Sequence, residues 1–259
     1  MKDFARASAL VGYGDFSRTL NLNPVVLLNS VGIPISVLEH AEGVISYKRF
    51  LRLLELSALQ SEDPLFGLKF GLYQGVSVLG PLLYLIRNCR TFGEALLELQ
   101  QFFHLHMGAA QIEFTQSGQY SLLAYRVLDP AQPGISQGVE LALGVGYQLL
   151  KTLLGKQWQA NAIYVEHAPL ASQKNYNRLL SQRPFFNHSE SAILFESKWL
   201  SEPLTNADPE LHQLIRKHLS SMEELTNQEL PAYVDFLLRN LLAQGQANIT
   251  LTNIKHMLA

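Results

Sequence analysis

The sequence predicts an α+β fold: a small, mostly antiparallel sheet packed by helices, with a helical N-terminal third and a helical C-terminal extension. Changes in apolar periodicity along the chain support this class. Up to about residue 106, apolar residues recur every three or four positions, as on one face of a helix. Between residues 111 and 195, short alternating runs flank one long helical segment, and helical spacing returns after residue 208.

Capping residues mark the expected helix starts in the N-terminal third. Residues 23–24 are Asn-Pro, and Ser46 precedes a run with apolar residues at helical spacing. Thr91 and Glu94 form a capping box, in which each side chain can satisfy a free amide at the start of a helix expected to run through residue 106. This third is therefore predicted to be a series of short helices.

The middle of the chain mixes strands with helices. Alternation at Ile112 and Phe114, a Ser-Gly turn and a β-prone run predict a hairpin over residues 112–127. A long helix over residues 136–154, ended by a glycine, argues against an all-β barrel. The remaining expected elements are a strand at 162–166, a helix at 172–180, and a second strand pair formed by 184–187 and 192–195.

The last part of the chain is expected to be helical and to contain the boundaries between the predicted domains. A helix is predicted from residue 209, and another, opened by Pro231, ends at Gly245. The final helix has an apolar stripe with nothing following to cover it, so we expect the natural chain to continue. The predicted parts are a main domain (1–225), a linker helix (226–247) and the start of a further domain (248–259).

Composition excludes several classes of protein. The 259 residues are 47% hydrophobic, enough for a globular core, and the formal net charge of −2 is unlike that of a domain gripping phosphates. The single cysteine, Cys89, allows no internal disulfide, and neither an export signal nor an apolar run of bilayer length is visible. We expect a cytoplasmic protein with no membrane partner.

Tests for catalytic or metal chemistry find no convincing pattern. His104 and His106 are two positions apart on an expected helix and point to different faces, whereas shared metal ligation needs spacings of three or four. Ser77, between Gly75 and Gly80, lacks the spacing of a nucleophile elbow. The sequence therefore predicts no catalytic residue, metal site or cofactor.

Candidate ligand-binding residues are polar groups among apolar neighbours, because ligand cavities are mostly apolar with a few placed hydrogen-bonding groups. Glu140 and Tyr147 lie seven apart, and so on one face, in the otherwise apolar helix 136–154. Tyr125 and Arg126 lie on the predicted hairpin, which could pack beside this helix. The alternative is that Glu140 and Arg126 form a structural ion pair while the tyrosines fill the core.

Three segments resemble the AraC family of bacterial transcription regulators, in the subfamily with an arabinose-binding-type N-terminal domain. They are residues 63–71 (DPLFGLKFG), 91–96 (TFGEAL) and 186–207, which contains WLSEPL. Residues 249–259 are similar to the opening helix of that family's helix-turn-helix domain, although Lys255 replaces a usually small residue. The resemblance implies an effector-binding or dimerisation role here, and promoter DNA binding through a C-terminal domain. The alternative is a stand-alone small-molecule sensor or scaffold without DNA binding.

Regulators that act at paired DNA half-sites commonly dimerise, so we expect a homodimer. The predicted contact is the helix opened by Pro231, which has a broad apolar stripe. Alternatively, this stripe packs onto the helix 209–222 of its own subunit. The stripe consists of Val234, Leu237, Leu238, Leu241 and Leu242.

Overall fold

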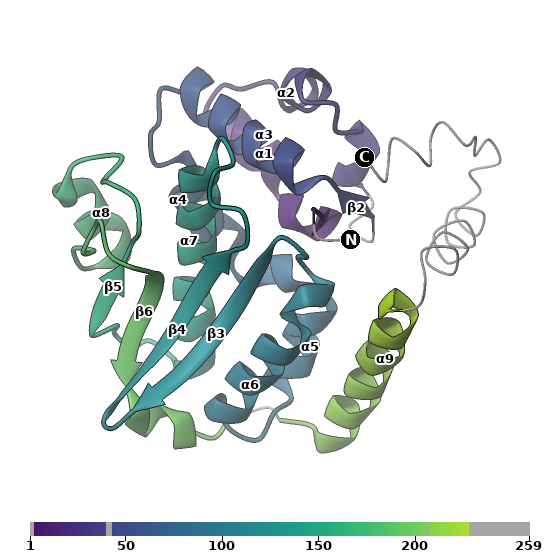
Figure 1. Cartoon of the computed structure of the whole chain (residues 1–259), viewed down its shortest axis with the longest axis vertical. Coiled ribbons are helices and arrows are strands. Elements are labelled where there is room, and N and C mark those ends of the chain that lie inside the picture. Colours follow the sequence, from purple (N-terminus) through teal and green to yellow (C-terminus); the bar gives the residue numbers. More distant parts are fainter. Residues whose placement is uncertain (1–2, 40–42, 206, 228–259) are drawn as a thin grey trace.

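The computed structural model describes residues 3–39, 43–205 and 207–227, and they form a mixed helical and sheet structure (Figure 1). The predicted α+β class is confirmed. The helices are α1 (Tyr13–Thr19), α2 (Pro24–Ser30), α3 (Tyr47–Gln60), α4 (Phe66–Gln74), α5 (Pro81–Arg87), α6 (Phe92–Phe102), α7 (Ile135–Leu154), α8 (Gln173–Leu180) and α9 (Pro209–Asn227). The strands are β1 (Ala5–Arg6), β2 (Val44–Ile45), β3 (Ala110–Ser117), β4 (Tyr120–Val127), β5 (Ala162–Tyr164) and β6 (Ser191–Glu196).

The predicted caps start three of the helices. The Asn23 side chain accepts hydrogen bonds from the Val25 and Val26 amides at the start of α2. The Ser46 hydroxyl caps α3, and the Thr91 hydroxyl accepts from the Glu94 amide at the start of α6. The helix predicted to reach residue 106 is shorter, because α6 ends at Phe102 and a 3-10 turn follows.

Four strands form the main sheet in the order β3-β4-β6-β5, with every neighbour antiparallel. The β3–β4 hairpin confirms the predicted one. The second predicted strand pair is wrong, because β6 pairs with β4 and β5. Residues 184–187 form no named strand and join the sheet through a single parallel bridge between Phe185 and Tyr164. The remaining strands, β1 and β2, pair with each other in a separate small sheet.

Alternation along β4 separates the two faces of the sheet. Leu123 and Tyr125 belong to the inner face, and Leu123 is buried, whereas Arg126 belongs to the outer face and is exposed. Helix α7 runs behind the sheet in Figure 1 and contacts β4 and β6. This places α7 between the sheet and the N-terminal helices.

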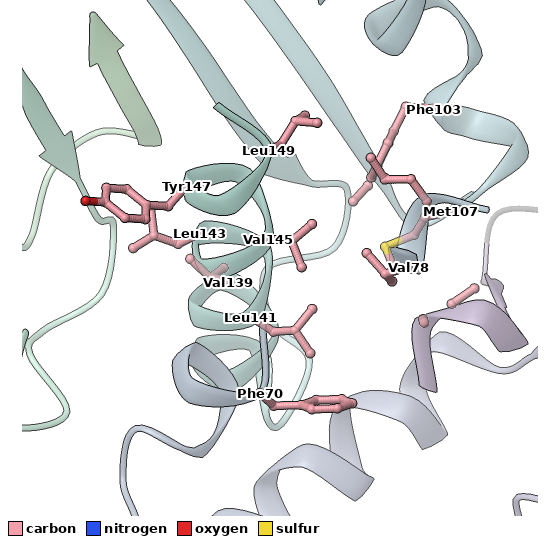
Figure 2. Packing of buried hydrophobic residues seen from close by; sticks show 14 of the residues in the cluster. Phe70, Val78, Phe103, Met107, Val139, Leu141, Leu143, Val145, Tyr147 and Leu149 are labelled. Atoms are coloured by element: carbon pink, nitrogen blue, oxygen red, sulfur yellow. The ribbon is translucent and has the colours of Figure 1, made fainter. Parts of the chain in front are cut away.

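Helix α7 is buried on more than one side, as its continuous apolar run predicts. In Figure 2, Leu141 and Val145 point toward the side on which Val78 and Met107 lie, whereas Leu143 points to the opposite side of the helix. A charged residue on such a helix is removed from water and needs polar partners inside the protein. Glu140 is in this position.

Helix α9, the last helix in the described residues, packs beside α5 and makes side-chain contacts with α6 (Figure 1). The Glu98 carboxylate of α6 accepts a hydrogen bond from Arg216 Nε of α9 at 2.8 Å, and His212 Nε2 lies 3.4 Å from the same Glu98 oxygen. Leu219 of α9 is buried in the core. No helix in the described part of the chain is long and apolar enough to cross a membrane.

Candidate functional site

Glu140 is the most deeply buried charged group among the described residues and lies in the second turn of α7. Its side chain is 0% exposed. The Tyr176 hydroxyl donates a hydrogen bond to Glu140 Oε1, whereas Glu140 Oε2 is buried and has no hydrogen-bond partner. Burial raises the pKa of Glu140 to about 7, and the hydrogen bond from Tyr176 opposes part of that increase. The carboxyl is thus near its titration midpoint at neutral pH.

Tyr176 of α8 and His167 complete the polar cluster around Glu140. The Tyr176 hydroxyl also accepts a hydrogen bond from the Leu170 amide at 3.3 Å, and burial raises its pKa. His167 Nε2 lies 3.7 Å from Glu140 Oε1, and His167 Nδ1 lies 2.7 Å from the Ala168 carbonyl oxygen. Contact with that carbonyl fixes the proton on Nδ1 and leaves Nε2 as the lone-pair nitrogen of the neutral ring.

The electrostatics of this cluster favour neutral forms. Burial lowers the pKa of His167, just as it raises that of Glu140. The Phe186 ring packs edge-on against Tyr176, with 4.8 Å between centroids, and makes the surroundings apolar. An apolar shell around a carboxyl with one unsatisfied oxygen is suited to holding a polar group of a ligand.

A cavity of about 430 Å³ opens beside this cluster, between α3 and the first turn of α7. It borders the cluster through Leu170, whose amide is bonded to Tyr176. Ser136, in the first turn of α7, also lines the cavity and lies four positions before Glu140, on the same face of the helix. The other lining side chains include Glu55, Ala58, Leu59, Glu62, Pro64 and Ile135.

The predicted residue Tyr125 lies in a different environment. Its hydroxyl is 3.2 Å from Met107 Sδ and 3.4 Å from the Tyr47 hydroxyl, and its ring packs edge-on against Phe103. Burial raises the pKa of Tyr125 well above 10. The Tyr47 hydroxyl lies close to Gly138, two positions before Glu140 and so on nearly the opposite side of α7.

The alternative pairing of Arg126 with Glu140 is wrong. Arg126 NH2 forms an ion pair with Glu113 Oε2 of the neighbouring strand at 2.9 Å, on the outer face of the sheet. Both side chains of this pair are largely exposed. Arg126 is therefore remote from the buried cluster, because Glu140 packs on the inner side.

Tyr147 is buried on α7, two turns beyond Glu140. Its ring packs against Trp158 with 5.7 Å between centroids, and Lys151 Nζ lies 5.4 Å from its centre. Glu140, Tyr125 and Tyr147 thus have different partners, and none of the three lines the cavity between α3 and α7.

Metal ligands are not grouped in the described residues, where no set of three His, Cys, Asp or Glu side chains could hold an ion. His104 lies 3.3 Å from Glu223 of α9. His106 is buried, and its burial lowers its pKa to about 4. The two histidines thus have different surroundings.

The sequence model of the arabinose-binding N-terminal domain of AraC transcription regulators matches residues 22–204. The chain belongs to this family. The match includes α7, the Glu140 cluster and the cavity, so these features are part of the AraC-type regulatory domain.

Relatives and a solved structure agree with this assignment. The HTH-type transcriptional regulator VirS of Mycobacterium tuberculosis is 28% identical over 245 residues, which are 94% of this chain and 72% of VirS. The crystal structure of the transcriptional regulator CdpR from Pseudomonas aeruginosa has a similar fold, with a TM-score of 0.55 and 16% identity, over 93% of this chain and 74% of CdpR. This AraC-type chain is thus similar to transcription regulators along nearly its whole length.

Two residues of the cluster were missed by the sequence analysis of this AraC-type domain. Tyr176 follows Glu140 by 36 positions and His167 follows it by 27, so no local spacing connects them. The available signal was the burial of Glu140 itself, which requires a partner somewhere in the fold. The predicted dimerisation stripe, Val234 to Leu242, lies outside the described residues.

Proposed function

We propose that this AraC-type domain binds a small-molecule effector beside Glu140 and transmits its presence to a DNA-binding region. The observation that supports this most is the unsatisfied, 0% exposed Glu140 oxygen, in a cluster that a cavity of about 430 Å³ borders through Leu170 without reaching Glu140 itself. Leaving a buried acceptor without a partner costs roughly 1–3 kcal/mol, so such a group usually has a reason to be kept. A ligand that satisfies this oxygen would recover part of that cost on binding.

We infer that DNA contact is made by a helix-turn-helix outside residues 3–227. The printed name of VirS describes an HTH-type regulator, and the formal net charge of −2 of this chain is poorly suited to gripping phosphates by itself. Because bacterial promoter DNA lies in the cytoplasm, we infer that the protein acts there. Paired DNA half-sites favour a homodimer.

The test measures DNA binding by this 259-residue chain and by any longer product of the same gene, using fluorescence anisotropy with genomic fragments at physiological salt. We expect sequence-specific binding by the gene product, altered by a small-molecule extract of the host. The chain alone should show no preference among the fragments. Specific binding by the chain tighter than about micromolar would contradict the inference that DNA is bound outside residues 3–227. If the gene product shows no specific binding with or without extract, the regulator proposal is overturned.

A further inference from the structure

We propose that residues 168–181, which comprise α8 and the loop before it, form a lid that opens away from α7 as a unit and is pinned shut by the hydrogen bond from Tyr176 to the buried carboxyl of Glu140. This conformational device goes beyond the proposed effector binding and does not depend on the identity of any ligand. Three features support it: the weak packing of α8, its single polar connection to the domain, and the backbone at the two ends of the lid.

Helix α8 is attached more loosely than the other helices of the described chain. It alone among them has no extended contact with another helix or strand, and it lies at the outer edge of the molecule in Figure 1. Tyr176 and Leu180 are its buried side chains, and most of the others are exposed. Elements with few buried apolar contacts open at a lower free energy than the core of the same domain.

The sequence of α8 gives this helix little stability of its own. It has 8 residues, and a helix of this length is marginal in water. The Ser172 side chain does not cap it, and Lys174 in the first turn lies unfavourably close to the positive end of the helix dipole. The helix is therefore maintained by its attachment to the rest of the domain.

One hydrogen bond joins the lid to α7. The Tyr176 hydroxyl donates it to Glu140 Oε1, and both side chains are 0% exposed. Within the described chain, no other hydrogen bond or ion pair connects residues 168–181 to a part of the protein beyond the adjacent His167. The attachment of the lid therefore depends on this bond and on the burial of Tyr176 and Leu180.

The chain is held in place just outside both ends of the lid. At the first end, the Asn187 amide donates to the His167 carbonyl oxygen at 3.2 Å. At the second end, Ser181 has a φ of 58°, in the left-handed region where helices commonly stop. The Phe185 amide then donates to the Ile163 carbonyl oxygen of β5 at 2.8 Å. The segment between these fixed points can move without disturbing the sheet.

Opening of the lid changes both the surroundings of Glu140 and the cavity between α3 and α7. The Leu170 amide donates to the Tyr176 hydroxyl at 3.3 Å, so Leu170 moves with the pin, and Leu170 lines the cavity. The same movement withdraws the one hydrogen-bond donor that Glu140 has within the described chain. The lid thus links the shape of the cavity to the state of the buried carboxyl.

Hydrogen exchange of the 259-residue chain, followed by mass spectrometry at neutral pH in low concentrations of urea, tests the lid. We expect the hydrogen-bonded amides of α8 to open about tenfold or more as often as those of α7. Their opening should also respond less to urea, because it exposes less surface than unfolding of the domain.

Tyr176→Phe removes the pin and keeps the ring. It should increase the opening of α8 about tenfold and leave the β3–β4 hairpin unchanged. Tyr147→Phe is the matched control, because Tyr147 is also buried but its hydroxyl has no hydrogen bond within the described chain. The control should leave the opening of α8 unchanged.

Trypsin provides a second measurement that needs no substitution. Lys174 and Arg178 of the lid are exposed, as is Arg52 of the well-packed α3, but a peptide bond inside a helix is cut only after the helix opens. We expect cleavage after Lys174 or Arg178 to be faster than cleavage after Arg52.

The lid is rejected if the amides of α8 open only together with those of α7 and the hairpin, or if the bonds after Lys174, Arg178 and Arg52 are cut at the same rate. The pin is rejected if Tyr176→Phe leaves the opening of α8 unchanged, or if Tyr147→Phe increases it as much. None of these measurements involves DNA or an effector, so a failure of the lid leaves the proposed function standing.

Discussion

Gly71 of α4 lies directly against the backbone of Leu141 of α7, so close that a Cβ added to Gly71 would stand 2.2 Å from the Leu141 carbonyl oxygen. The approach is mutual, because a Cβ on Gly144 would stand 2.7 Å from the Leu68 carbonyl oxygen. Backbones in contact at this spacing leave no room for side chains between the helices. The position of α7, and with it that of Glu140, is therefore fixed by glycine on both helices.

Gly71→Ala should destabilise the domain by about 2 kcal/mol or more, because the new methyl group must push α4 away from α7. Urea unfolding followed by circular dichroism measures the change. The matched control is Gly146→Ala on α7, where the added Cβ would meet only Ile193 Cδ1 at 3.5 Å. That control should gain up to about 1 kcal/mol from helix propensity. Equal stability of the two variants would show that the α4–α7 contact is looser than described.

Glu140→Gln should make the domain more resistant to rising pH. Burial raises the pKa of Glu140 to about 7, whereas an unfolded glutamate titrates near 4.3, so the folded state holds the proton more tightly between these values. The free energy of unfolding contributed by Glu140 is therefore highest below pH ~4.3, falls as the pH rises to about 7, and is constant above. The total change is up to about 4 kcal/mol.

Buried histidines change the free energy of unfolding with pH in the opposite direction, at lower pH. The effect of Glu140 is therefore obtained by comparing the wild type with the variant. His106, with its pKa lowered to about 4, stabilises the fold increasingly as the pH rises from 4 to 6.5, and His167 acts in the same direction. The free energies of unfolding of wild type and Glu140→Gln are measured in urea from about pH 5 to 8. Their difference at each pH gives the contribution of Glu140 to the pH dependence of stability. A difference independent of pH would mean that Glu140 titrates normally, and Glu210→Gln at an exposed position of α9 serves as the control.

Periodicity and capping signals were enough to predict the class, the β3–β4 hairpin and the burial of Glu140, because these depend on local residue patterns. They could not supply the partners of Glu140, since Tyr176 on α8 and His167 in the loop after β5 are brought to it only by the tertiary fold. The same limit explains the wrong second hairpin: alternation identifies β6 as a strand but does not select β4 over residues 184–187 as its neighbour. Alternation likewise placed Tyr125 on a face without showing that Tyr47 and Met107 lie opposite it.

The contact between Glu98 and Arg216 should hold α9 on the domain. Arg216 Nε is 2.8 Å from Glu98 Oε1, and the Glu98 side chain is 13% exposed, so this pair is better shielded than a surface one. A double-mutant cycle with Glu98→Gln and Arg216→Gln should give a coupling of about 1 kcal/mol. Hydrogen exchange should show faster opening of α9 amides in Glu98→Gln with little change in the sheet. Uniform loosening of α9 and the sheet would argue against a separately docked helix.

Leu238→Glu should dissociate the homodimer expected for this chain, because Leu238 is central in the predicted apolar stripe and a carboxylate there would be buried in the interface. Sedimentation equilibrium at tens of micromolar should show a dimer for the wild type and a folded monomer for the variant. Leu214→Glu is the control, because Leu214 on α9 is 67% exposed and has little to lose within the subunit. If Leu214→Glu dissociates the dimer and Leu238→Glu does not, the interface lies on α9 instead. A wild-type chain that is monomeric at these concentrations would reject self-association of this chain.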